Sequence, residues 1–466
     1  MSIWDEFKRA FGVSPVSIDK LNQTALKTPP QVDSSFQKKS DIEVTPEYQQ
    51  IFDWINAKAP IIFVTGKAGT GKTTFIQYLR ENFKDNLVVV APTGVAALQV
   101  GGVTIHSFFQ LPPRVVTEED IKVVRDRKLY QKLRLLVIDE ISMVRAEVID
   151  AIDQFLQLNR ENKAPFGGVQ LLMVGDLFQL PPVVPKREQE ALDKMGYESP
   201  YFFSAKILKQ CSLVSKELTK IYRQSEESFI WALNRVRLAE LSNYVLPLLN
   251  SRCTPFDQIK ETVITLASTN RVADQINEHE LGKIASPIQT FVGEVTGKFA
   301  LEDEKLPSPI NLALKVGAQV MFTKNDEKKR WVNGSLGRVV EFVGDVIRVE
   351  TGSVDLKKIY DVQRVKWESF RYEFDDDLEK IVPVSSGVYR QYPLMLAWAV
   401  TIHKSQGKTL DKVRIDLGAG AFDYGQVYVA LSRCRSLEDI QLARPIQKED
   451  IKCDPVIKRF YQAFNI

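Results

Sequence analysis

Gly66-Lys67-Ala68-Gly69-Thr70-Gly71-Lys72-Thr73 follows the apolar stretch Ile61-Ile62-Phe63-Val64 and precedes the helix-like segment Thr74–Leu79. This run has the spacing G-x-x-x-x-G-K-[ST] in the strand–turn–helix context that a phosphate-binding loop requires. Its glycines allow successive backbone N–H groups to surround phosphate oxygens, and the helix N-terminus adds partial positive charge. An ordinary glycine-rich turn does not need every one of these positions. We therefore predict that the chain binds a nucleoside triphosphate.

Residues of this loop have separate predicted tasks. Lys72 is expected to contact the β- and γ-phosphates, and Thr73 is expected to hold Mg²⁺. The other loop positions predicted to bind the triphosphate are Gly66, Gly69, Gly71 and Thr74.

Two further polar turns each follow a buried apolar run. Asp139 and Glu140 close the run Leu135–Ile138, and we predict that Asp139 holds Mg²⁺ while Glu140 polarises the attacking water. Gln179 lies in Gly175–Pro182, and its neutral amide is suited to sensing the γ-phosphate. Hydrolysis also requires positive charge on the transferring phosphoryl group.

Arg223 and Arg433 are the candidates for that charge, although each also fits a surface position on a helix. If both point across a cleft toward Lys72, ATP bridges two domains and its loss lets them part.

Short β-branched runs that alternate with helical stretches predict parallel sheets buried on both faces. One series covers residues 44–217, with a small insertion at about 110–127. A second series begins near residue 218. In parallel sheets, ligands bind beyond the carboxyl ends of the strands, where the polar turns are expected to gather.

The second series is interrupted by a different pattern. Val339–Val343 and Val346–Glu350 flank the two-residue turn Gly344-Asp345, which predicts a β-hairpin. We interpret residues 335–395 as an antiparallel β module inserted between 218–334 and 396–466.

Residues 1–43 form a separate segment. Trp4, Phe7 and Phe11 lie on one face of a short predicted helix, and a polar stretch follows it. Two interpretations stay open: a frayed helix with a flexible tail, or a helix that docks on a protein partner or on the body of the chain.

Composition sets broad limits on function. The chain has 466 residues, 44% of them hydrophobic, and a formal net charge of only +3, so a nucleic-acid surface has to be a local groove. The four cysteines are widely scattered, which predicts free thiols in a reducing cytoplasm. No apolar run approaches the length of a membrane span, and the N-terminus lacks the pattern of a signal peptide.

The tripeptide Thr-Ile-His occurs twice, at Thr104-Ile105-His106 and at Thr401-Ile402-His403, in a chain with only three histidines. Chance is one explanation. The other is that two related α/β domains use the same loop for the same task.

In order along the chain, these motifs resemble those of superfamily-one DNA helicases of the 5′-to-3′ branch, and among them the petite-integration-frequency (PIF-type) helicases. The matching segments are GKAGTGKT (66–73), APTGVAA (91–97), GGVTIHSFF (101–109), VIDEISMV (137–144), APFGG (164–168), GDLFQLPPV (175–183), YRQ (222–224), TNRVADQIN (269–277), VMFTKN (320–325), NGSLG (333–337), AWAVTIHKSQGKTLD (397–411) and YVALSR (428–433).

The resemblance implies two RecA-like parallel-sheet P-loop motor domains in tandem, with a small SH3-like antiparallel β-barrel inserted in the second. It implies an ATP- and Mg²⁺-dependent motor that moves 5′ to 3′ on single-stranded DNA and unwinds duplex or structured DNA. The resemblance also implies that Gln406 and Gly407 are part of the nucleotide-binding site. The implied DNA-binding residues are Thr93, His106, Ser107, Phe108, Phe109, Thr269, Asn270, His403, Lys404 and Ser405.

One position departs from the family pattern. The family has a glutamine upstream of the first strand that reads adenine, whereas here that position is Tyr48, or Gln49 after a shift of one residue. A tyrosine can stack on a base but cannot make the two-sided amide contact.

Two other functions remain open from the residues alone: a motor directed to RNA or RNA–DNA hybrids, and a switch-like ATPase that binds nucleic acid without processive movement. The expected partners are single-stranded DNA and single-strand/duplex junctions. We expect a monomer with no membrane association, located in the cytoplasm with the nucleoid in a bacterial or phage setting.

Overall fold

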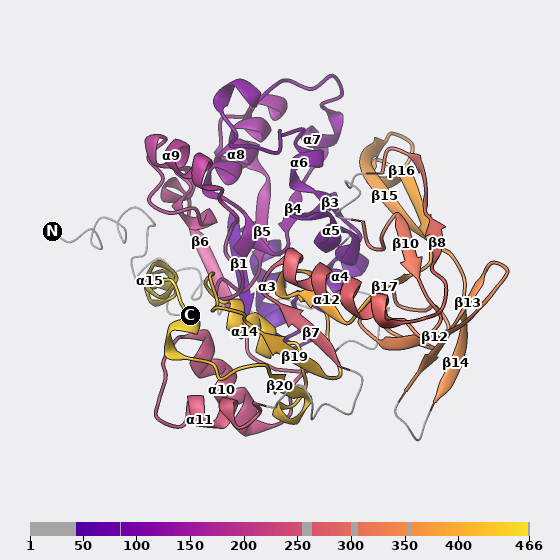
Figure 1. The fold of residues 1–466 in the computed structure, drawn as a ribbon. Helices are drawn as coiled ribbons and strands as arrows, with labels where there is room; N and C mark the ends of the chain where they lie inside the picture. The colour runs from indigo at the N-terminus through magenta and orange to yellow at the C-terminus, as the bar shows by residue number, and fades with distance from the viewer. Residues whose placement is uncertain (1–42, 84, 254–262, 300–305, 353–356, 465–466) are drawn as a thin grey trace.

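The computed structural model describes residues 43–83, 85–253, 263–299, 306–352 and 357–464 (Figure 1). The predicted Trp4/Phe7/Phe11 helix lies outside the described residues. None of the helices in these ranges is both long and apolar enough to cross a bilayer.

The first α/β unit, residues 43–218, is built on a six-stranded parallel sheet. Its strands, in spatial order, are β3 (Val103–Thr104), β2 (Leu87–Ala91), β4 (Leu135–Ile138), β5 (Gln170–Val174), β1 (Ile61–Gly66) and β6 (Leu213–Leu218). Its helices are α3 (Pro46–Asn56), α4 (Lys72–Asn82), α5 (Gly94–Val100), α6 (Ile105–Phe108), α7 (Lys128–Lys132), α8 (Ala146–Arg160) and α9 (Lys186–Lys194).

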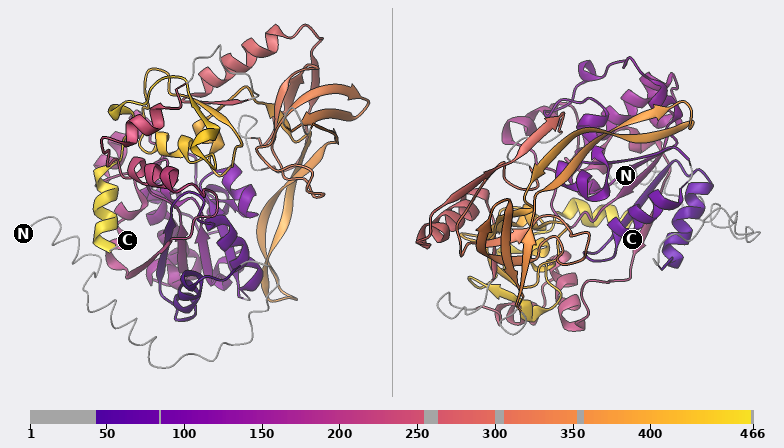
Figure 2. Two further views of the ribbon diagram at one scale, coloured as in Figure 1. Left: turned by 90° about the horizontal axis from the view of Figure 1, so that it is seen from below. Right: turned by 90° about the vertical axis from the view of Figure 1, so that its right-hand side faces the viewer.

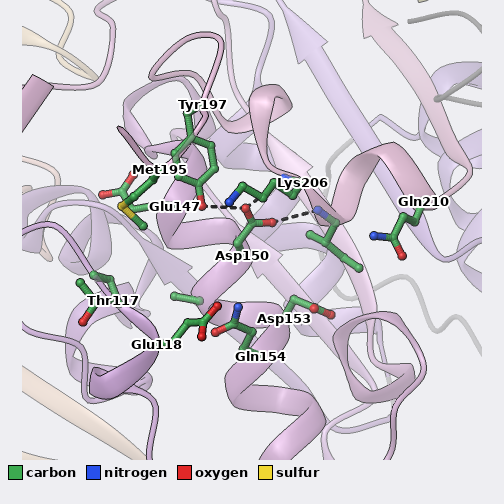
Figure 3. A pocket seen from close by; sticks show the side chains of 13 residues that line it. Thr117, Glu118, Glu147, Asp150, Asp153, Gln154, Met195, Tyr197, Lys206 and Gln210 are labelled. Carbon is green, nitrogen blue, oxygen red and sulfur yellow. Dashed lines mark hydrogen bonds between the residues drawn. The ribbon is translucent and has the colours of Figure 1, made fainter. Parts of the chain in front are cut away.

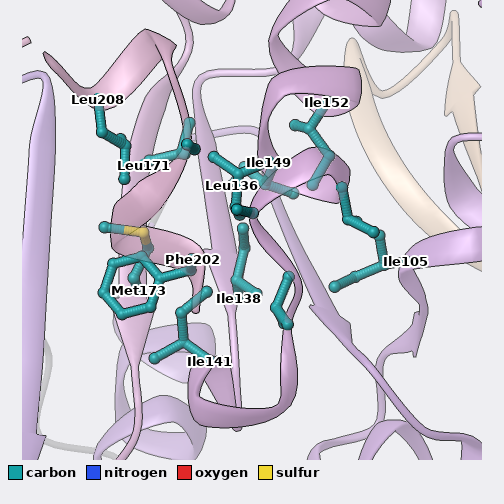
Figure 4. Packing of buried hydrophobic residues seen from close by; sticks show 14 of the residues in the cluster. Ile105, Leu136, Ile138, Ile141, Ile149, Ile152, Leu171, Met173, Phe202 and Leu208 are labelled. Carbon is teal, nitrogen blue, oxygen red and sulfur yellow. The ribbon is translucent and has the colours of Figure 1, made fainter. Parts of the chain in front are cut away.

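Both faces of this sheet are buried, as predicted. Along β4, Leu136 and Ile138 pack into one core cluster, and Leu135 and Val137 pack into the cluster on the opposite face. Figure 4 shows the first cluster, in which β4 and β5 side chains meet those of α8. The alternation explains why β4 is apolar at every position.

The second α/β unit has a four-stranded parallel sheet. Its strands, in spatial order, are β18 (Ala399–Thr401), β7 (Ile264–Ala267), β19 (Val413–Asp416) and β20 (Ile440–Leu442). Its helices are α10 (Glu227–Arg237), α11 (Val245–Asn250), α12 (Asn270–Lys283), α13 (Ile402–Ser405) and α14 (Gln426–Leu431).

Antiparallel strands are inserted in the second unit. A five-stranded sheet has the order β14 (Lys358–Val362), β13 (Val346–Thr351), β12 (Leu336–Val343), β11 (Gln319–Phe322), β17 (Leu394–Leu396). A three-stranded sheet has the order β15 (Val365–Asp375), β16 (Lys380–Gln391), β9 (Glu294–Gly297), and β10 (Asn311–Leu314) pairs with β8 (Gln289–Val292). The turn Gly344-Asp345 joins β12 to β13, as predicted.

The antiparallel strands begin at Gln289, well before the predicted start at residue 335. Strands β8 and β9 have four residues each, and β9 is exposed along its whole length. They therefore lack the alternation of buried and exposed side chains that identifies a strand in a sequence.

The long β15–β16 hairpin contacts the first unit. The Tyr372 hydroxyl accepts a hydrogen bond from Val89 N (3.4 Å), Ile381 N donates to Asn86 Oδ1 (2.8 Å), and Lys128 pairs with Asp376. Figure 1 shows the hairpin beside α6 and α7.

The last helix, α15 (Pro455–Phe464), also belongs to the core of the first unit, although the prediction assigned residues 396–466 to the second. Phe460 stacks on Phe203, with ring centroids 4.4 Å apart, and meets Phe63 of β1 at 5.8 Å. Figure 2 shows α15 in yellow alongside the first unit. The chain thus passes through the second unit and ends against the first.

Candidate functional site

The phosphate-binding loop joins β1 to α4, as predicted. Gly69 and Gly71 have φ angles of +84° and +83°, a backbone conformation that residues other than glycine rarely adopt. The Lys72 Nζ donates to the carbonyl oxygens of Gly66 (2.6 Å) and Lys67 (3.1 Å), while Thr73 and Thr74 are exposed. The residues of a triphosphate site are therefore assembled at the N-terminus of α4.

Asp139 and Glu140 lie at the end of β4, beside this loop. Burial raises the pKa of both carboxyl groups, and the proximity of Glu140 raises the pKa of Asp139 further. Lys72 acts in the opposite direction on both groups. Glu140 has a φ of +49°, which is unusual for a residue with a side chain and strains the backbone at the site.

The amide of Gln406, from the second unit, connects two predicted catalytic residues of the first. Its Nε2 donates to Glu140 Oε2 (3.2 Å) and to Gln179 Oε1 (3.3 Å). The neighbouring Gly407 lies against Gln99 of α5, close enough that an added Cβ would be 2.8 Å from its side chain. The predicted nucleotide site is thus lined by residues of both units.

The two candidate arginines, Arg223 and Arg433, lie close to each other beside Ser432. Arg433 is 2% exposed and donates to Val429 O (2.8 Å) and Ser432 Oγ (2.8 Å). Burial and, to a smaller extent, the positive charge of Arg223 lower its pKa to about 9, whereas Tyr428 and Glu140 act in the opposite direction. Arg223 donates to Ser432 O (3.0 Å), and its Cβ would be 2.6 Å from a Cβ at Gly69.

Tyr48 is not placed to stack on a base, which corrects the expectation for that position. Its ring is 4% exposed and packs against Phe75 at 4.8 Å, and its hydroxyl donates to Gly71 O (3.4 Å). Gln49 is exposed and donates to Asp53 instead. The reason is helical geometry: Tyr48 lies on the face of α3 that packs on the sheet, together with Ile51, Phe52 and Ile55.

Tyr222 is the aromatic side chain that is exposed beside the loop. It is 53% exposed, its ring atoms would be 3.7 Å from a Cβ at Gly71, and Lys220 lies over its ring at 5.2 Å. In the segment Tyr222-Arg223-Gln224 the sequence predicts a role for Arg223 but none for Tyr222.

The predicted DNA-binding residues occur at equivalent places in the two units. Thr93 caps α5 by accepting from Ala96 N (3.2 Å), and Thr269 caps α12 by accepting from Val272 N (3.4 Å). Each of these threonines follows a central strand of its sheet, and Asn270 is exposed at the start of α12.

The two Thr-Ile-His segments also have the same local structure. Thr104 and Thr401 each end an edge strand and cap the next helix, with φ/ψ of −75°/148° and −75°/152°. His106 and His403 are partly buried, and the next residues, Ser107 and Lys404, are exposed.

Three of the predicted DNA-binding side chains point inward, which corrects their assignment. Phe108 and Phe109 are 6% and 1% exposed and pack with Tyr130 and Phe155, so their rings are core residues. The Ser405 hydroxyl is fully buried and donates to Ile402 O (2.7 Å). Phe108 and Ser405 end short helices and Phe109 follows one, and the sequence alone does not distinguish them from the exposed residues Ser107 and Lys404 beside them.

Two cavities lie away from the phosphate-binding loop. One of about 220 Å³ is lined by Glu118, Glu147, Asp150, Asp153 and Tyr197, and contains no predicted site residue (Figure 3). Another of about 1050 Å³ lies between the segment that follows α6 and the β15–β16 hairpin, and Ser107 lines it.

Among the described residues, no cluster of three or more His, Cys, Asp or Glu side chains is arranged to hold a metal ion. The four cysteines are unpaired thiols, as predicted.

Comparison with known proteins gives a consistent result. Residues 43–258 match the family model described as PIF1-like helicase. The ATP-dependent DNA helicase Pif1 of Bdellovibrio bacteriovorus is 33% identical over 91% of this chain and 93% of that protein. The chain spans about three fifths of the length of vertebrate relatives that it matches, 58% and 62% in two of them.

Two solved structures are similar to most of the chain. Bacteroides sp Pif1 in complex with ADP-AlF4 superposes with a TM-score of 0.83 at 39% identity, covering 91% of this chain and 98% of that one. Bacteroides Pif1 bound to ssDNA covers the same shares at the same identity, with a TM-score of 0.67.

Proposed function

Because the chain belongs to the PIF1-like helicase family, we propose that it is an ATP-dependent DNA helicase that moves 5′ to 3′ on single-stranded DNA and unwinds duplex or structured DNA. One observation carries the proposal: a single site is lined by Lys72 and Glu140 from the first unit and by Gln406 and Arg433 from the second. Hydrolysis in such a site is coupled to the relative position of the two units.

The residues present fit ATP and Mg²⁺. The loop Gly66–Thr73 would hold the phosphates, with Lys72 released from the backbone carbonyls that it now contacts. Mg²⁺ usually keeps several waters and takes only one or two protein ligands in addition to phosphate oxygens. Thr73 and Asp139 would supply those ligands, so a larger acidic cluster is not required.

The water and the transferring phosphoryl group would meet groups from both units. Glu140 would accept the proton of the attacking water, and burial, which raises its pKa, favours that role. Gln179 and Gln406 would orient the water, and Arg223 and Arg433 would neutralise the developing charge. Tyr222 would provide a flat apolar surface for the base.

DNA would be held by residues of the paired loops that are exposed or partly buried. Thr93 and His106 would contact the strand on the first unit, and Thr269, Asn270, His403 and Lys404 would contact it on the second. In each capping threonine the hydroxyl oxygen accepts a backbone hydrogen bond, which leaves its hydrogen available for a phosphate oxygen. Contacts of this kind hold the backbone without selecting a sequence.

The remaining expectations are part of the same proposal: single-strand/duplex junctions as partners, a monomeric state, a cytoplasmic location and a SH3-like barrel in the insertion. For domain limits we propose that the inserted module starts at β8 and that α15 is grouped with the first unit. The strand pairing and the packing of Phe460 support these limits.

The test is unwinding of duplexes that carry either a 5′ or a 3′ single-stranded tail, with Lys72→Ala as the inactive control. We expect ATP-dependent strand separation of the 5′-tailed duplex only. Activity on the 3′-tailed duplex alone would contradict the polarity. DNA-stimulated ATP hydrolysis without strand separation would favour a switch-like ATPase, and a preference for RNA–DNA hybrids would favour the hybrid-directed motor.

A further inference from the structure

Asp176, two residues after β5, is a fully buried acid. Its two carboxylate oxygens have different partners. Oδ1 accepts from Arg237 Nη2 (3.0 Å) and Nε (3.2 Å), whereas Oδ2 accepts from the Tyr428 hydroxyl (3.2 Å) and from Gln179 Nε2 (3.4 Å). A single carboxylate therefore joins two residues of the second unit to a predicted catalytic residue of the first.

The hydrogen bond to Asp176 decides which end of the Gln179 amide faces the nucleotide site. Because Nε2 is held by Asp176, Oε1 is directed to Gln406, whose Nε2 also donates to Glu140. The reversed amide would place two NH₂ groups against each other, where neither can accept. The buried carboxylate thus determines the donor and acceptor pattern at the place of the attacking water.

Tyr428 makes a second connection, to the phosphate-binding loop. Its hydroxyl accepts a hydrogen bond from Ala68 N (2.9 Å) while donating to Asp176. Tyr428 lies on α14 of the second unit, and Ala68 lies within the loop of the first. The phosphate-binding loop therefore makes a direct hydrogen bond to the second unit.

Arg237 also contacts two aromatic rings. Its guanidinium lies 4.2 Å from the centroid of the Phe178 ring and 5.6 Å from that of Tyr461 on α15. The Tyr461 hydroxyl is in turn 2.6 Å from Thr65 Oγ1, at the residue before the loop. Both members of the Arg237–Asp176 pair are buried, and such a pair contributes little net stability compared with apolar side chains of similar volume. Stability alone gives no reason for this pair.

We propose that Arg237 and Tyr428 are positioning residues for ATP hydrolysis: by holding Asp176 they orient the Gln179 amide toward Gln406 and Glu140, and only while the two units are in contact. The inference rests on the proposed ATPase function and assigns part of the coupling between the units to this carboxylate. Separation of the units removes Arg237 and Tyr428 from Asp176, and the Gln179 amide then loses its fixed orientation.

The experiment compares Tyr428→Phe and Arg237→Gln with the wild-type protein. DNA-stimulated ATPase gives kcat and KM, a fluorescent ATP analogue gives nucleotide affinity, and a melting curve gives the folded fraction. Tyr197→Phe is the matched control, because Tyr197 also donates from a buried ring to a buried carboxylate, Asp150 (2.8 Å), outside the site (Figure 3). Tyr428→Phe removes one oxygen atom, so it keeps the test informative if Arg237→Gln does not fold.

We expect kcat to fall about 10- to 100-fold in both variants, as when a residue that orients a catalytic group is lost. KM and analogue affinity should stay within about twofold of the wild-type values. When Arg237→Gln is added to Gln179→Ala, single-turnover kinetics should show little further decrease in the rate of ATP hydrolysis.

The inference would be overturned by an unchanged kcat in folded Tyr428→Phe, by a loss confined to nucleotide affinity, or by an equal loss of kcat in Tyr197→Phe. Losses in Arg237→Gln and Gln179→Ala that simply multiply would also overturn it. A wild-type protein without DNA-stimulated ATPase would instead contradict the proposed function, and this is measured before any variant.

Discussion

The two parallel sheets share a block of four strands in the same order, β3-β2-β4-β5 in the first unit and β18-β7-β19-β20 in the second. Strand pairing aligns them residue by residue. Ala91 pairs with Thr104 in one sheet, and Ala267 pairs with Thr401 in the other. The loops that follow these strands carry Thr93 and Thr269, each of which caps a helix. The repeated tripeptide therefore reflects a shared framework.

The two sheets differ in strand β1 and in the loop that follows it. The first sheet continues through β1 and β6, and β1 leads into the phosphate-binding loop, whereas the four-stranded sheet has no counterpart of β1 among its described strands. The acidic residues at the ends of the equivalent strands β4 and β19 also have different surroundings. Asp139 faces Lys72, but Asp416, which pairs with Ala267, accepts from Gly418 N (2.9 Å). In the proposed function, loops of both units hold the DNA strand, but among the described residues only the first unit has a phosphate-binding loop.

The largest expected effect concerns that single phosphate site. Lys72→Ala should lower kcat for ATP by at least about 10²- to 10³-fold, because the charge that stabilises the transferring phosphate is lost. The measurement is steady-state ATPase with single-stranded DNA. Lys209→Ala, at an exposed lysine paired with Glu198, is the control and should retain full activity. Substantial ATPase in Lys72→Ala would mean that the second unit also hydrolyses ATP.

The two aligned acids should respond differently. Asp139→Asn should reduce Mg²⁺-dependent ATPase about 10- to 100-fold, because a metal ligand is lost. Asp416→Asn should leave ATPase within about twofold of wild type, since its partner is a loop amide. ATPase titrated with Mg²⁺ measures both variants. Equal losses in the two would contradict the distinction between the units.

The paired DNA loops should differ in their salt dependence. Ser107 and Lys404 occupy the same position after the two histidines, but only Lys404 carries a charge. Lys404→Ser should reduce the slope of log affinity against log salt by about 0.7, the value for one phosphate contact on a single strand. Ser107→Ala should leave the slope unchanged. Fluorescence anisotropy with a labelled oligonucleotide at several salt concentrations measures the slopes, and an unchanged slope in Lys404→Ser would remove Lys404 from the interface.

The smallest effect concerns the shared framework itself. Thr104→Ala and Thr401→Ala should each lower the free energy of unfolding by about 1 kcal/mol, because each removes a helix cap. Urea unfolding measures the change, and Thr290→Ala, on an exposed position of β8, is the control. Clearly different losses at the two caps would show that their similar geometry does not extend to their energetics.

The features that were predictable from the sequence depend on local patterns. The strands that precede the polar turns, the phosphate-binding loop and the Gly344-Asp345 hairpin each follow from residues adjacent in the chain. The features that were missed depend on contacts between distant segments. Tyr48 is buried because one face of α3 meets the sheet, and α15 packs beside β1 almost 400 residues away in the chain.

The same reason explains what was missed within the site. Asp176 lies in the segment Gly175–Pro182, which the sequence identifies as a functional turn. Nothing in the sequence near Arg237 indicates that Arg237 is the partner of Asp176. Tyr222 was visible beside Arg223, but its exposure depends on how the segment passes the loop.

In the proposed mechanism, ATP hydrolysis changes the distance between the DNA-binding loops of the two units. Spin labels at Val95→Cys on α5 and Asp274→Cys on α12, with the partly exposed Cys253 and Cys453 replaced by serine, report that distance. On single-stranded DNA, we expect a different distance with a non-hydrolysable ATP analogue than without nucleotide, and no nucleotide-dependent change in Lys72→Ala. The same distance in both states of the otherwise active protein would contradict the account.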